Sequence, residues 1–120
     1  MTTAGENSTA SNAANCVNAP VLHDFMLLMH NDTASEPPSE MWDGYFSFLH
    51  ASQHFEGGSE IGSGATFRKP GSATPGSTSD HLTGFIRVRA SSLADAQRFL
   101  AGNPVYECGG TVEIRELPKS

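Results

Sequence analysis

The sequence predicts an α+β fold, a ferredoxin-like β-α-β-β-α-β sandwich with an antiparallel four-stranded sheet. Segments of strand length alternate with two amphipathic segments of helix length in that order. Two helices can cover only one face of such a sheet, while the expected first strand is apolar on both of its faces. A second copy of the sheet would cover the remaining face, so we predict a homodimer with sheets packed face to face.

The first strand is expected over residues 24–30. Residues 25–29 are all apolar, and His30, Asn31 and Asp32 follow them directly. A strand with apolar residues on both parities is covered on both faces. This segment therefore predicts a buried strand that ends in a polar cluster.

The first helix is expected from the proline pair 37–38 to about Phe55, with Ser35 or Ser39 as its cap. The glycine pair 57–58 is expected to end it. Its apolar positions make a stripe wide enough for a helix that lies on a sheet. These positions are Met41, Trp42, Tyr45, Phe46, Phe48 and Leu49.

A short strand interrupted by glycine is expected within residues 59–69. The segment that follows is rich in Gly, Pro, Ser and Thr and has no apolar periodicity, which is typical of a loop. A loop over residues 63–79 is longer than most connections between elements, and long loops are commonly functional or disordered. We expect this loop to lie over the polar end of the sheet like a lid.

The third strand is expected over residues 81–90 and the fourth over 109–118, both with apolar residues at alternate positions. The second helix lies between them. Ser92 is its predicted cap, Asp95 stands three residues on, and Gly102 marks the stop, with Pro104 after it. The apolar stripe of this helix consists of Leu93, Ala96, Phe99 and Leu100.

Charge excludes two classes of partner. The chain has 7 Lys+Arg against 13 Asp+Glu, a net charge of −6, and its basic residues are scattered. Nucleic acids and anionic membrane surfaces both require a basic patch, so neither is an expected partner. No apolar run approaches the roughly 20 residues that span a bilayer.

Residues 1–20 predict a flexible tail, and residues 21–120 predict the folded domain. The tail is small and polar, and it has no Lys or Arg and no apolar core of a secretory signal. Cys16 and Cys108 lie far apart, one of them in the tail. We therefore expect a reduced, cytoplasmic chain.

Three segments resemble the YciI-like family, also called the YCII-related or DGPF-type family: FMLLMHND, GFIRVRASSLADAQRFLAGNP and GGTVEIRELP. The resemblance covers residues 24–118. It implies a dimeric α+β barrel and an enzyme suspected from a His and an Asp that line a cleft. The DGPF motif itself is absent, and only Asp80 stands in a similar place. Trp42 occupies the helix position of the suspected histidine, so that role is not carried over.

The expected topology brings polar strand ends to one edge of the sheet. His30, His81, Asp32 and Asp80 are the predicted catalytic residues, since a carboxylate can orient an imidazole that acts as a base. The ligand contacts are predicted to come from Trp42, Tyr45 and Cys108. The imidazoles could equally hold a metal ion with water in the remaining positions. No residue is assigned as a metal ligand, and no cofactor is expected.

Two functions follow from these features. The first is a small-molecule-binding dimer or small enzyme that performs proton-transfer or lyase-type chemistry on a small polar molecule. The alternative is a non-catalytic binding or accessory dimerisation module. Polar residues gathered beside a pocket favour the first, and histidines that point to bulk solvent favour the second.

Removing the tail tests the domain boundary. A chain that starts at Val21 is expected to melt within a few degrees of the full chain, because residues 1–20 carry almost no large apolar side chains. Thermal unfolding followed by circular dichroism measures the difference. A truncated chain that no longer folds would contradict the boundary at Pro20.

Overall fold

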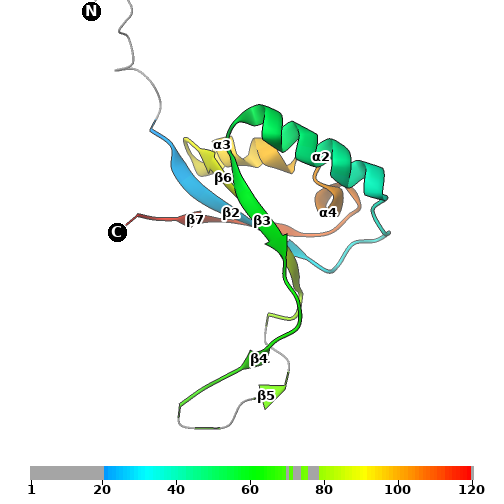
Figure 1. The fold of residues 1–120 in the computed structure, drawn as a ribbon, viewed down its shortest axis with the longest axis vertical. Helices are drawn as coiled ribbons and strands as arrows, with labels where there is room; N and C mark the ends of the chain where they lie inside the picture. The colour runs from blue at the N-terminus through cyan, green and yellow to red at the C-terminus, as the bar shows by residue number, and fades with distance from the viewer. Residues whose placement is uncertain (1–20, 70, 72–73, 76–78, 120) are drawn as a thin grey trace, which may run out of the picture.

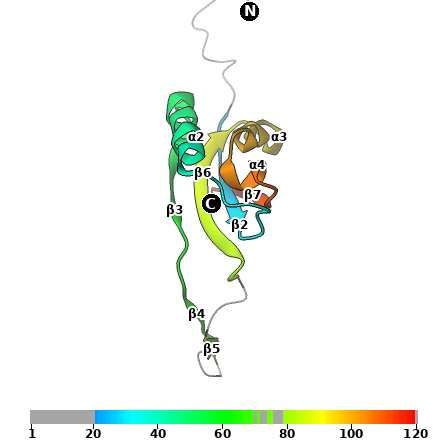
Figure 2. The same cartoon turned by 90° about the vertical axis from the view of Figure 1, so that its right-hand side faces the viewer.

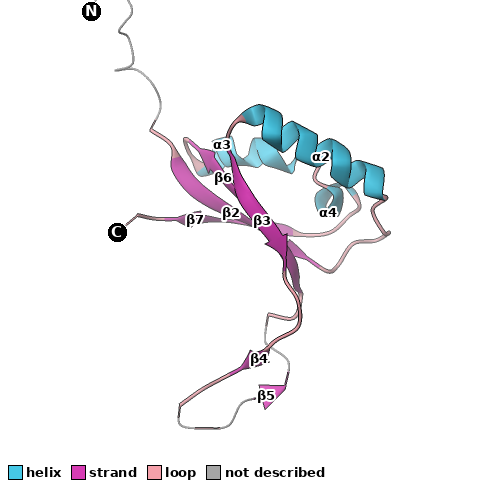
Figure 3. Cartoon of the chain, viewed as in Figure 1, coloured by secondary structure: helices cyan, strands magenta, loops and turns pink. Residues whose placement is uncertain are grey.

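The computed structural model describes residues 21–69, 71, 74–75 and 79–119, and the predicted tail lies outside these residues. A four-stranded sheet carries its helices on one face, and a short two-stranded ladder stands apart from it (Figures 1 and 3). The elements are β2 (His23–His30), α2 (Ser39–Ser52), β3 (Phe55–Glu60), β4 (Ala65–Thr66), β5 (Thr74–Pro75), β6 (Leu82–Ala90), α3 (Leu93–Ala96), the 3-10 turn η3 (Gln97–Leu100), α4 (Pro104–Glu107) and β7 (Val112–Leu117).

The strand order in the sheet is β3-β6-β2-β7, and every neighbouring pair is antiparallel. The predicted α+β class and the four-stranded antiparallel sheet are confirmed, and the arrangement is compatible with a ferredoxin-like sandwich. Strand β2, the first of the sheet in chain order, lies between β6 and β7. Its residues therefore pair on both sides.

The pairing of β2 divides its residues between two faces. Phe25, Leu27 and Met29 are buried and join the core that the helices cover. Met26 and Leu28 are half-buried and point to the opposite face, here called the open face, which the described helices leave uncovered. The other core residues are Tyr45, Leu49, Ile86, Val88, Ala90, Ala96, Phe99 and Val105.

Helix α2 begins and ends differently from the prediction. Pro38 occupies the N-cap position and no side chain caps the helix, so neither Ser35 nor Ser39 has the predicted role. The helix ends at Ser52 because Gln53 adopts a left-handed conformation with φ 62°. Among the apolar residues of the predicted stripe, only Tyr45 and Leu49 are buried.

The glycine pair 57–58 lies inside β3 and does not end the helix. Gly57 has φ 118° at a register shift against β6, a conformation that favours glycine. A Cβ on Gly58 would lie 2.4 Å from the Phe85 carbonyl oxygen, so only glycine lets the two strands approach this closely. The expectation of a strand within residues 59–69 placed it too late for this reason.

The described residues of the predicted lid do not cover the polar end of the sheet. Two segments of that loop, β4 and β5, pair with each other and project away from the sheet (Figures 1 and 2). We call described residues 61–69, 71 and 74–75 the arm. Pairing between β4 and β5 satisfies backbone groups of the arm without any contact with the four-stranded sheet.

The second predicted helix is two short elements, and a third follows. Ser92 caps α3 as predicted by accepting a hydrogen bond from the Asp95 N–H, while the Asp95 carboxylate accepts one from the Ser91 N–H. Gly102, with φ 82°, lies between η3 and α4. Helix α4 was not predicted from the sequence. Asn103 caps α4 through the Tyr106 N–H, ahead of proline at the first helical position. Leu93, assigned to the apolar stripe, is 52% exposed.

Tyr45 links α2 to η3. Its hydroxyl donates a 2.7 Å hydrogen bond to the buried Phe99 carbonyl, and its ring is 2% exposed. Burial raises the pKa of Tyr45 to about 12, although a hydrogen bond with the Asn103 side chain acts in the opposite direction. The neutral phenol is therefore the form that the fold accommodates.

Replacing Tyr45 with Phe tests this link. The change leaves the Phe99 carbonyl without its donor, and we expect a loss of about 1–3 kcal/mol in the free energy of unfolding. Because the folded pKa is raised from 10.0 to about 12, wild-type stability falls as the pH rises through that window, and Tyr45→Phe removes this contribution. Urea unfolding at neutral and alkaline pH measures both effects. The exposed Tyr106→Phe is the control, and equal stability of the two variants would contradict the assigned role.

Candidate functional site

The ends of β2 and β6 hold two histidines side by side. His30 is the last residue of β2, and its N–H donates to the Thr111 carbonyl at 3.0 Å. The next N–H, of Asn31, donates to the His81 carbonyl at 2.8 Å. These backbone bonds fix the positions of both histidines without using their rings.

The imidazole rings contact each other edge to face. Their centroids lie 4.8 Å apart, with an interplanar angle of 68°. His30 is half-buried and His81 is exposed. The structure therefore brings together the two histidines that the sequence analysis singled out, with one ring shielded and the other facing solvent.

Glu113, which the sequence analysis did not select, is the carboxylate beside His30. It pairs with Leu28 across β2 and β7, so it shares the open face with His30. Its Oε1 lies 3.5 Å from Nε2 of His30, and its Oε2 accepts a 3.2 Å hydrogen bond from Arg115. The alternation of β7 indicated an outward Glu113, but only the register with β2 places it next to a histidine.

One nitrogen of this cluster lacks a hydrogen bond. His30 Nε2 is buried and has no hydrogen-bond partner among the described residues, because its contact with Glu113 is long. An unsatisfied buried polar atom costs free energy, and most folds avoid it. The geometry therefore places a buried imidazole nitrogen beside a carboxylate, a pair of groups that general acid–base sites use.

Asp32 holds the adjoining turn. Its two carboxylate oxygens accept hydrogen bonds from the N–H and the hydroxyl of Thr111, at 2.8 and 2.6 Å. The bond from the Thr111 hydroxyl contributes most, and together the two bonds hold the pKa of Asp32 below its ordinary value of 3.8. Asp32 thus ties the end of β2 to the start of β7, whereas Glu113 is the carboxylate that lies at ion-pair distance, 3.5 Å, from the His30 ring.

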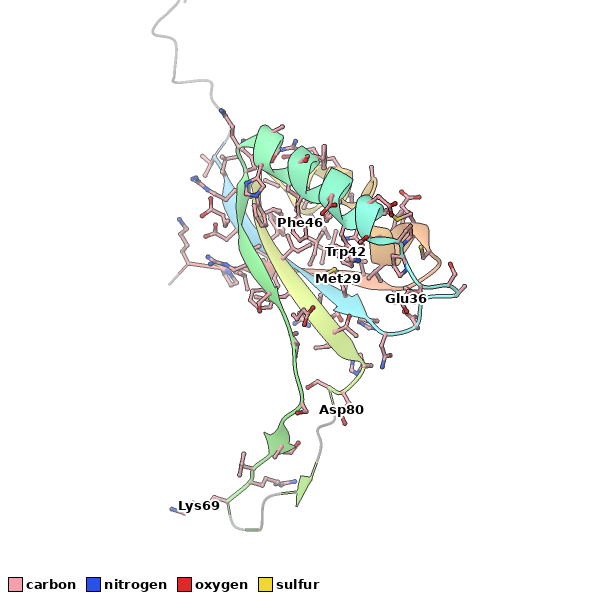
Figure 4. All side chains as sticks on the ribbon, turned by 45° about the vertical axis from the view of Figure 1, so that its right-hand side comes forward. Met29, Glu36, Trp42, Phe46, Lys69 and Asp80 are labelled. Carbon is pink, nitrogen blue, oxygen red and sulfur yellow. The ribbon has the colours of Figure 1, made fainter. Side chains whose placement is uncertain are left out.

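Trp42 lies at a different place from the histidines. It lines a hollow of about 560 Å³ between α2 and the facing residues of β3 and β6, which we call the α2 hollow. Met29 and Phe46 line it as well, and Figure 4 shows both beside Trp42 beneath α2. Since Met29 faces the helices and His30 faces the open face, the hollow and the histidine pair lie on opposite sides of the sheet.

The remaining predicted site residues have different surroundings. Tyr45 is in the core and does not line the α2 hollow. Asp80 lines a second hollow of about 580 Å³ at the base of the arm, between residues 61–65 and 79–83 (Figure 4). Cys108 is a half-buried free thiol at the end of α4, and its carbonyl accepts the Ala34 N–H.

Metal ions and membranes each require a recognisable arrangement of the described residues. No group of three or more His, Cys, Asp or Glu side chains within them is placed to hold a metal ion. Within the same residues, no helix has the length and apolar character needed to cross a membrane.

Comparisons of the chain with protein-family models, with curated proteins and with solved structures gave no match. The YciI-like resemblance stays a prediction.

Proposed function

We propose that this protein is a YciI-like homodimer in which His30 and His81 form an acid–base site for a small polar molecule. The observation that carries the proposal is the buried Nε2 of His30, which has no hydrogen bond of its own among the described residues although a carboxylate lies 3.5 Å away and a second imidazole contacts the ring. Groups that cost stability in this way are commonly retained at functional sites.

The three side chains have separate roles in this proposal. Glu113 is a positioning residue that favours the proton on Nε2 of His30, which leaves the other ring nitrogen as the base. The carboxylate also compensates the charge that His30 acquires when it takes a proton from the ligand. His81 is exposed and contacts the ligand from the solvent side.

The dimer in this proposal forms through the open face. Met26, Leu28 and Phe85 are half-buried there without a helix over them. Arg115 and Glu113 follow each other along β7 on the same face, so a two-fold axis can place each beside its opposite charge in the partner. The histidine pair lies at the end of β2, at the rim of this contact, and stays accessible.

Reactivity of the imidazoles tests the site. We expect His30→Gln and His81→Gln each to lower the second-order rate of p-nitrophenyl acetate hydrolysis by at least about tenfold, because a positioned acid–base group contributes that much or more. His50→Gln, which replaces an exposed histidine on α2, is the control and should leave the rate unchanged. The melting temperatures of all three variants should stay close to that of the wild type. Equal rates in all four proteins would refute the acid–base site and favour the accessory dimerisation module.

A matched pair of leucine variants tests the dimer. Light scattering of the wild type should give about twice the chain mass of 12.7 kDa. Leu28→Glu puts a carboxylate on the open face and should give the monomer mass, because an unpaired charge is costly in an apolar contact. Leu93→Glu makes the same change at an exposed position on α3 and should remain a dimer. A wild-type mass of one chain, or a Leu28→Glu dimer, would contradict this interface.

A further inference from the structure

We propose that the α2 hollow receives the arm of a second copy of this chain, with Phe67 as the anchor. The inference rests on the proposed dimer, to which the arm would add a second contact, but it does not require the histidine site. Its failure and the failure of the proposed function therefore appear in different experiments.

Phe67 is the most exposed large apolar residue of the described chain, at 75%. It directly follows β4 in the arm, whose two strands hold it away from the sheet (Figures 1 and 2). A large aromatic side chain exposed on a projecting hairpin is typical of an anchor that is buried by a partner. The described body of the same chain does not cover it.

The α2 hollow has the shape and lining of the complementary surface. Its volume of about 560 Å³ exceeds what one phenylalanine side chain fills, and Met29, Trp42 and Phe46 supply apolar contacts. Trp42 and Phe46 are stacked with ring centroids 5.9 Å apart, and Phe46 is itself 36% exposed. An entering aromatic ring would extend this stack and cover Phe46.

Charge agrees with this pairing. Arg68 and Lys69 follow Phe67 directly, so the arm is basic in a chain of net charge −6. Glu60 lines the hollow, and Glu40 and Asp43 are exposed on α2 on either side of Trp42 in the sequence. A basic arm that enters beside Glu60 favours this occupant over an anionic ligand.

A second copy is the occupant that the geometry favours. The arm leaves the sheet directly after Glu60, which lines the hollow, and then runs away from it, with Lys69 far from Trp42 in Figure 4. Its own hollow is therefore out of reach in this conformation. In a two-fold dimer each chain would give its arm and receive the other, which closes the contact without leaving an open end.

The single tryptophan of the chain reports on the hollow. Phe67→Ser keeps Trp42 but lacks the anchor, and Trp42→Phe keeps the anchor but lacks the reporter. We expect Phe67→Ser to emit at longer wavelength than the wild type, and added Trp42→Phe protein to shift its emission back in a saturable manner. The double variant Trp42→Phe/Phe67→Ser, added instead, should cause no shift. Phe48→Ser, which replaces an exposed phenylalanine of α2 outside the hollow, should emit like the wild type.

Two further measurements test the same inference without the Trp42→Phe protein. Dilution of the wild type should move its emission to longer wavelength, and Phe67→Ser should raise the apparent dissociation constant by about tenfold or more. Glu60→Arg should weaken the contact, and Glu60→Arg/Arg68→Glu should restore it.

Three results would overturn the inference. Phe67→Ser could emit like the wild type at every concentration, which would show that Phe67 does not enter the hollow. Mixing could have no effect while wild-type emission is independent of concentration, which would assign the hollow to the chain's own arm. Wild-type emission could respond only to added anilinonaphthalene sulfonate, which would assign the hollow to a small apolar molecule.

Discussion

The antiparallel pairing of β2 with both β6 and β7 is the constraint on which the rest of the structure depends. It saturates the backbone of the central strand and fixes which side chains face the helices. Phe25, Leu27 and Met29 form the centre of the core because of this register, and the residues between them have no helix to contact. The core, the open face and the histidine cluster are three consequences of one hydrogen-bonding pattern.

The irregularity at the end of β2 shapes the candidate site. The register against β6 shifts between Met29 and His30, and the Thr83 hydroxyl donates to the Met29 carbonyl there. A bulge of this kind redirects the side chains around it. Hydrogen bonds between Asp32 and Thr111 then hold the end of β2 to the start of β7. The backbone beneath the His30 ring is therefore fixed, although its Nε2 has no hydrogen bond among the described residues.

Periodicity predicted β6 and β7 well because apolar alternation survives in the folded chain as burial. The proximity of His30 and His81 was also accessible from the sequence, since it follows from strand order and direction. Glu113 was not, because its neighbour across the sheet depends on a register that periodicity does not specify. The predicted end of α2 was wrong because Gln53 adopts a left-handed conformation that glycine usually adopts. The predicted start of β3 was wrong because Gly57 and Gly58 belong to this strand, and Gly58 allows β3 to lie close to β6. The sequence Asn103-Pro104, a capping residue followed by proline, is typical of a helix start and could have predicted α4.

The opposite orientation of Met29 and His30 constrains how this chain can diversify. Met29 lines the α2 hollow and His30 belongs to the histidine pair on the open face. Substitutions on one of these two surfaces leave the other intact, so each can change separately. Insertion or deletion of a residue within β2 has the reverse effect, because it exchanges the two surfaces and turns Asp24 or His30 toward the core. Change in length is therefore confined to places such as the arm, where no alternation has to be kept.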